Sequence, residues 1–170
     1  MNATIFLDKL HRALLRHDYR TMTNLIRSFL REFFGRPARW MEGVRISPCR
    51  PSKNPIERLP RYVAAATMAG REIILPRHYW KILRSNPDYA LFIVLHELGH
   101  VVAGRTAATQ RYRTDPRARD ASEFFAEFFA LFLFHAAGRR WDHIPIHNKY
   151  LGSLGGLMRT LVEELKKKED

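Results

Sequence analysis

Cysteine, acidic residues and long apolar runs are all scarce in this chain of 170 residues. Its single cysteine, Cys49, rules out an intramolecular disulfide and favours a reducing compartment. No stretch reaches the roughly 18 consecutive apolar residues that a membrane-spanning helix needs. The amino-terminal residues lack a basic region followed by an apolar one, so we expect no ordinary secretory signal. These absences predict a cytoplasmic protein, although they leave export by a non-classical route open.

The acidic residues are outnumbered, with 17 Asp and Glu against 29 Lys and Arg, which gives a net charge of +12. A field of this sign favours acidic partners, such as acidic substrate peptides, nucleic acid or anionic membrane surfaces. The basic residues are spread along the chain, with a denser group between residues 105 and 119, and no nucleic-acid-binding module accompanies them. We therefore interpret the charge first as a solvated surface. Nucleic acid remains a partner that no motif supports, and the sequence predicts no oligomeric state.

What is present predicts a mainly α-helical α+β domain. Hydrophobic residues make up 46% of the chain and aromatic residues 12%, which is enough for one folded domain over residues 1–170. Apolar side chains recur at helical spacing over residues 4–15 and 19–34, so residues 1–34 should form a helical hairpin. The proline-rich residues 35–60 should be an irregular connection. Residues 61–138 form the expected core, and residues 139–170 a C-terminal helical segment.

A short β-hairpin or sheet should precede the helix on which the core depends. Ala69-Gly70 marks a turn and residues 71–75 have the composition of a strand. An exposed edge of such a hairpin could pair with an extended peptide. A short helix is expected over residues 78–83. Asn86 is a helix N-cap residue, Pro87 suits the first helical position, and Asp88 suits the positive end of the helix dipole. A helix should therefore begin at this point.

That helix carries the sequence His96-Glu97-Leu98-Gly99-His100, an H-E-x-x-H motif in an otherwise apolar stretch. Residues four apart share one helix face, so both histidine rings can reach the same metal ion. Glu97 lies one position further round, where its carboxylate can take a proton from a water on the metal. The alternative is that both histidines are hydrogen-bonded core residues. Burying three polar groups on an apolar helix is costly without a function, which favours the metal site.

A catalytic zinc site usually has three protein ligands and one open position, and the next helical segment offers the third ligand. Glu123 and Glu127 are four residues apart on one face of an almost wholly apolar helix. Glu123 fits as the third ligand, and Glu127 could accept the free ring N–H of a ligating histidine. The two carboxylates could also exchange these roles. A purely structural alternative is a capping box at the helix start between Asp120 and Glu123. This alternative would leave the expected burial of Glu127 unexplained.

The H-E-x-x-H motif followed by the helical Glu123-Phe124-Phe125-Ala126-Glu127 resembles the gluzincin metallopeptidases. Within them it is similar to the catalytic domains of anthrax lethal factor and the clostridial Pro-Pro endopeptidases. The resemblance covers residues 90–135. It implies a zincin-like fold with residues 61–138 as the catalytic core, Zn²⁺ bound by His96, His100 and Glu123, Glu97 as catalytic base and Glu127 in support of the ligands.

The lethal-factor family also uses a tyrosine shortly before the ligand glutamate to stabilise the oxyanion. Tyr112 is the nearest candidate for this catalytic role, although it lies several residues further upstream than the family pattern. His143 and His147 are weaker candidates and fit ordinary surface histidines better. Cys49 or the N-terminal hairpin could block the zinc site in a latent form of the enzyme.

The resemblance therefore predicts a zinc-dependent endopeptidase with a protein or peptide substrate, such as a toxin or effector protease. A second hypothesis is a regulatory metallopeptidase of the ImmA/IrrE or anti-restriction type, which would act on a nucleic-acid-associated protein. A hypothesis of another class is a non-catalytic basic binding module with a structural zinc. Glu97 counts against that module, because a structural site has no use for a base beside its ligands.

Overall fold

The computed structural model describes residues 2–35, 38–48, 65–68, 71–103, 118–140 and 143–144. Within these residues the protein is mainly helical with a small sheet, which confirms the predicted α+β class. The elements in chain order are α1 (Ala3–Leu15), α2 (Tyr19–Phe33), the 3-10 helix η1 (Arg39–Gly43), β1 (Arg45–Pro48), β2 (Ala66–Met68), β3 (Glu72–Leu75), α3 (Arg77–Ser85), α4 (Pro87–Ala103) and α6 (Ala118–Ala136). No helix in the described part of the chain is long and apolar enough to cross a membrane.

The predicted N-terminal hairpin is formed by α1 and α2. The side chain of Asn2 accepts a hydrogen bond from the Ile5 N–H (2.9 Å), and that of Asp18 accepts one from the Thr21 N–H (3.0 Å), so both helices begin at an N-cap. Gly35 follows α2 with a φ of 72°, a left-handed conformation that glycine adopts at no steric cost. The hairpin packs against β1 and against the helices α4 and α6.

In the part of the chain that the structure describes, the sheet has three strands in the order β1-β3-β2. β2 and β3 are antiparallel, with Thr67 opposite Ile73, which confirms the predicted hairpin before the central helix. β1 lies on the other side of β3 and runs parallel to it, with Arg45 opposite Glu72. Among the described strands, β1 and β2 therefore lie at the two edges of this sheet.

The prediction that residues 35–60 are irregular is wrong for the part that the structure describes. Residues 39–48 contain η1 and β1. β1 is only four residues long, it ends at Pro48, and Ile46 is its one buried apolar side chain. A proline is tolerated at the end of an edge strand. The strand exists because β3 pairs with it from a distance along the chain, and local composition gives no sign of that pairing.

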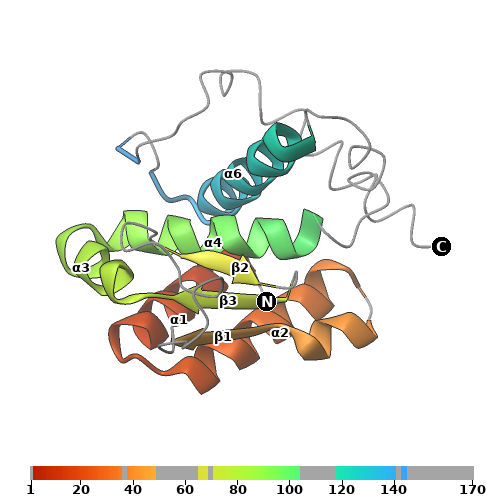
Figure 1. Ribbon diagram of the computed structural model, residues 1–170, viewed down its shortest axis with the longest axis horizontal. Coiled ribbons are helices and arrows are strands. Elements are labelled where there is room, and N and C mark those ends of the chain that lie inside the picture. Colours follow the sequence, from red (N-terminus) through yellow and green to blue (C-terminus); the bar gives the residue numbers. More distant parts are fainter. Residues whose placement is uncertain are drawn as a thin grey trace, which may run out of the picture.

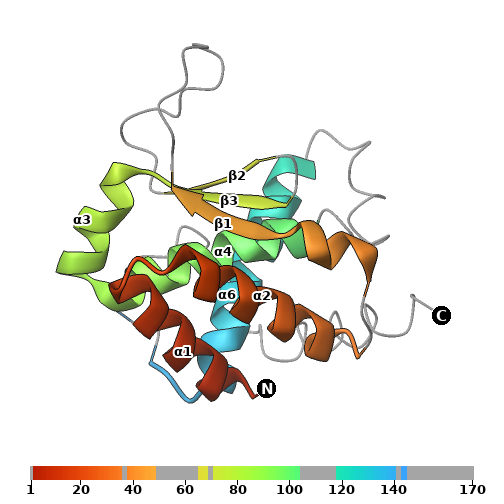
Figure 2. The ribbon, with the colours of Figure 1, turned by 90° about the horizontal axis from the view of Figure 1, so that it is seen from below.

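Helix α4 is the central element of the fold. Its side chains are buried almost all round, which is typical of a helix that is surrounded by protein. It packs against α6, α3 and α1 and against the strands β2 and β3. In Figure 1 the sheet and the α1–α2 hairpin lie below α4, and α6 crosses above it. Figure 2, seen from below, agrees, with α1 and α2 nearest the viewer and α6 behind α4.

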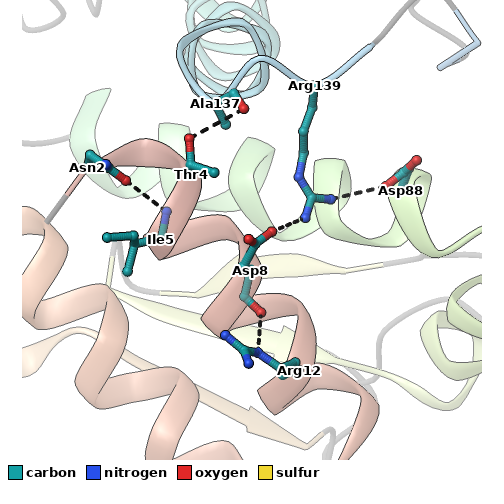
Figure 3. A network of polar contacts seen from close by, with 8 residues as sticks. All are labelled: Asn2, Thr4, Ile5, Asp8, Arg12, Asp88, Ala137 and Arg139. Carbon is teal, nitrogen blue, oxygen red and sulfur yellow. Dashed lines mark hydrogen bonds and ion pairs between the residues drawn. The ribbon is translucent and has the colours of Figure 1, made fainter.

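A polar network ties three helices together at one end of α4 (Figure 3). Arg139, just after α6, donates hydrogen bonds to Asp8 on α1 (2.5 Å) and to Asp88 in the first turn of α4 (3.3 Å). The Thr4 hydroxyl adds a longer contact to the carbonyl oxygen of Ala137 (3.4 Å). One guanidinium group thus joins the start of α4 to the end of α6 and to the hairpin.

We expect Arg139→Gln to lower the free energy of unfolding by about 1 kcal/mol, because ion pairs that are partly exposed contribute little each. Urea unfolding monitored by circular dichroism measures this change. Arg84→Gln, at an exposed position on α3, is the matched control and should have a smaller effect. Equal losses in the two variants would show that the network does not hold the helices together.

Candidate metal centre

The start of α4 sets the position of every polar side chain along it. The Asn86 side chain accepts a hydrogen bond from the Tyr89 N–H (3.1 Å), and Pro87 is the first helical residue, as the sequence predicted. From this start, His96 and His100 fall on one face of the helix. Their side chains are each 18% exposed. They lie at the surface of the apolar core rather than within it, which argues against the alternative of two core histidines.

The two histidines and Glu123 come together as the sequence predicted, with His96 and His100 on α4 and Glu123 on α6. The Nε2 atoms of His96 and His100 are 3.1 Å apart. The Glu123 carboxylate oxygens lie 3.2 Å from His96 Nε2 and 3.5 Å from His100 Nε2. Ligand atoms about 2.0–2.2 Å from a tetrahedral zinc ion are separated by about 3.3 Å. Both the donor set and the spacing therefore fit a zinc ion.

The charges at this cluster also suit a cation. Hydrogen bonds from His100 and His96 hold the pKa of Glu123 well below its usual range, against the opposing effect of burial. Burial lowers the pKa of His100, but the hydrogen bond and charge of Glu123, helped by the charge of Glu97, raise it overall. The carboxylates thus favour positive charge on the ring of His100, and a bound cation would supply that charge in place of a proton.

The cluster is open on its α6 side, because the side chain of Glu123 is 55% exposed. Among the described residues, no fourth protein ligand closes a position around the three donors. Catalytic zinc sites keep such a position for water or substrate, whereas structural sites are closed by a fourth protein ligand. Within the described residues the metal-ligand group consists of these three side chains and has no fourth member.

Glu97 lies beside the cluster and is buried, with 9% of its surface exposed. Its carboxylate oxygen Oε2 accepts a hydrogen bond from the hydroxyl of Thr67 on β2 (2.7 Å). The same hydroxyl is 3.0 Å from the main-chain carbonyl oxygen of Glu97. The hydroxyl from the sheet thus satisfies one oxygen of a buried carboxylate.

Sequence reasoning did not identify Thr67. It lies 30 residues before Glu97, and no spacing rule connects a residue on a strand to one on a helix at that distance. The surrounding segment of small residues gives no other signal. Only the packing of β2 against α4 brings the two side chains together.

Glu127 is buried on α6, one turn after Glu123, with 6% of its surface exposed. It is not part of the three-residue cluster, which agrees with the assignment of Glu123 rather than Glu127 as the third donor. Its support of a ligating histidine stays a prediction. The capping-box alternative does not fit, because α6 begins at Ala118 and Asp120 is already inside the helix.

A close contact between α4 and α6 brings the donors of the two helices together. A Cβ atom added at Gly99 would lie 2.7 Å from the Cα and 3.0 Å from the carbonyl oxygen of Ala126. Further along, Phe92 packs edge-on against Phe134 with ring centroids 6.4 Å apart. The two helices are therefore antiparallel. The absence of a side chain at Gly99 lets their backbones come into contact close to the two histidines and to Glu123.

Comparisons of the chain with models of protein families, with curated proteins and with solved structures found no match. The chemistry of this cluster therefore rests on its own residues and geometry.

Of the other candidates that the sequence suggested, His143 is described by the structure, and it does not join the cluster. His143 Nε2 lies 3.4 Å from Asp88 Oδ2, at the start of α4 and about 12 Å of helix away from His96. Tyr112, Cys49 and His147 lie outside the described residues. Most of the predicted C-terminal helical segment, residues 145–170, also lies outside them.

We expect Gly99→Ala to destabilise the protein by about 1–3 kcal/mol, because the added methyl group meets backbone atoms of α6 that cannot turn aside. Helix propensity alone predicts the opposite, a gain of about 1 kcal/mol. Urea unfolding therefore distinguishes the two effects by sign.

The matched control is Gly43→Ala, where the added Cβ would meet only the side chain of Arg71 at 3.4 Å. This variant should have near wild-type stability. A stabilised Gly99→Ala variant would show that α4 and α6 are not in close contact at this position.

Proposed function

We propose that this protein is a zinc-dependent endopeptidase of the gluzincin type. The observation that supports the proposal is one constellation on α4 and α6. Ligand atoms of two imidazoles and an accessible carboxylate lie within 4.8 Å of one another, and the buried residue next to His96 on the same helix carries a second carboxylate. That second carboxylate, Glu97, is what a binding module with a structural zinc would not need.

In this proposal, His96, His100 and Glu123 hold the metal. When bound, zinc supplies a Lewis acid that polarises a carbonyl group and lowers the pKa of a coordinated water to about 7. Glu97 accepts a proton from the water that attacks the scissile carbonyl carbon. It then gives that proton to the nitrogen of the leaving amine as the peptide bond breaks. Tyr112 remains the candidate for stabilising the oxyanion, on the strength of the family resemblance alone.

The net charge of +12 supports an acidic protein or peptide as the substrate, since opposite charge raises the rate of encounter. An effector protease related to the lethal-factor type and a regulatory protease of the ImmA/IrrE or anti-restriction type would share the same zinc chemistry. The two differ in their substrates, so a peptide library is the experiment that separates them.

Protein purified without added metal should contain about one zinc ion per chain, as a site with three protein ligands predicts. Glu123→Ala should lose this zinc, because it leaves only two histidine ligands. Elemental analysis after gel filtration measures the metal content.

The matched comparison is Glu127→Gln, which keeps the volume of a buried side chain one turn further along α6. This variant should retain most of its zinc. Loss of zinc chiefly in Glu127→Gln would reverse the roles of the two carboxylates, and a wild-type chain that binds no zinc even when it is added would refute the proposal.

Glu97→Gln should keep its zinc and lose peptidase activity by about 10²–10⁴-fold, because an amide cannot accept the proton from the attacking water. Cleavage of a peptide library, read by mass spectrometry, measures this loss. Glu42→Gln removes an exposed carboxylate on η1 and is the control, with wild-type activity expected. Full activity of Glu97→Gln at an unchanged zinc content would exclude Glu97 as the base.

A further inference from the structure

The hydroxyl of Thr67 is placed at the base by the register of the sheet. Thr67 on β2 lies opposite Ile73 on β3, and side chains of directly opposed residues point to the same face. Ile73 is fully buried, so this face of the sheet is the one that packs on the core and on α4. An apolar side chain such as valine would suit the position. Threonine has the same shape and adds one hydroxyl group, which meets Glu97.

This hydroxyl contacts two atoms of one residue. It lies 2.7 Å from Glu97 Oε2 and 3.0 Å from the main-chain oxygen of Glu97. A hydroxyl group has a single proton, so it can donate to only one of these oxygens at a time. Donation to the ionised carboxylate is the stronger of the two interactions, and it is also the shorter contact.

We propose that Thr67 is a positioning residue for the general base Glu97, an inference that rests on the proposed peptidase function. By holding Oε2, the hydroxyl fixes the rotation of the carboxylate and leaves Oε1 to take the proton from the attacking water. Thr67 itself touches neither the substrate nor the metal ligands in this scheme, and it gains or loses no proton overall.

The second acceptor gives the hydroxyl a partner in both halves of the reaction. While Glu97 carries the proton on Oε1, Oε2 still accepts, so the hydroxyl can donate either to Oε2 or to the main-chain oxygen of Glu97. When Glu97 passes its proton to the leaving amine, the hydroxyl returns to donating to the carboxylate. The side chain of Glu97 is thus held in one place before and after the proton transfer.

The test compares Thr67→Val, which keeps the shape and removes the hydroxyl, with Thr67→Ser, which keeps the hydroxyl. Against one cleaved peptide, Thr67→Val should lower kcat by about 10–100-fold, the usual effect of removing a group that orients a functional residue. KM and zinc content should stay at wild-type values, because the substrate and the metal do not contact Thr67. Thr67→Ser should restore most of kcat.

A measurement without activity tests the same contact. In zinc-free protein, Thr67→Val should lower the urea midpoint of unfolding, and this shift should be smaller in a Glu97→Ala background, where the carboxylate acceptor is gone. Equal shifts in the two backgrounds would overturn the contact on which the inference depends.

The kinetic outcomes separate the inference from the proposed function. A wild-type protein that cleaves peptides while Thr67→Val keeps its full kcat would overturn the role of Thr67 and leave the peptidase proposal standing. A loss of zinc or a raised KM in Thr67→Val would also overturn it, since either result indicates a purely structural role. If the zinc-loaded wild-type protein cleaves no peptide, the proposed function and the role of Thr67 fail together.

Discussion

The close contact of α4 with α6 at Gly99 and Ala126 is the constraint on which the candidate site depends. Helical spacing on α4 brings the two histidines together, but no sequence-local interaction holds Glu123 on α6 against them. Any side chain at position 99 would push the α6 backbone away, since a Cβ would lie 2.7 Å from the Cα of Ala126. Glu123 lies one turn before Ala126, so its distance to the two histidines follows directly from this contact.

The site also illustrates how the protein accommodates polar groups on a buried helix. His96, Glu97 and His100 interrupt an apolar surface, and leaving such groups unsatisfied would destabilise the fold. Two of them meet Glu123 at the surface. The third meets Thr67 from the sheet. The polar groups are therefore satisfied by two different layers of the fold, which fixes α4 in rotation between them.

Much of this arrangement could be predicted where the signals are local. The start of α4 follows from Asn86 and Pro87, and the shared faces of His96 with His100 and of Glu123 with Glu127 follow from helical spacing. The strand β1 could not be predicted, because its stability comes from pairing with β3 and its own four residues end in a proline. The contact of Thr67 with Glu97 is equally non-local, because it depends on which strand packs on α4.

The bridge from Arg139 to Asp88 has a mechanical consequence for the helix pair. α4 and α6 run in opposite directions and are fastened at two separate points, by this bridge at one end and by the backbone contact at Gly99 further along. The ring contact of Phe92 with Phe134 lies between these two points. Contacts spread along the helix pair in this way oppose sliding of α6 along α4, and such sliding would change the distance of Glu123 from the two histidines.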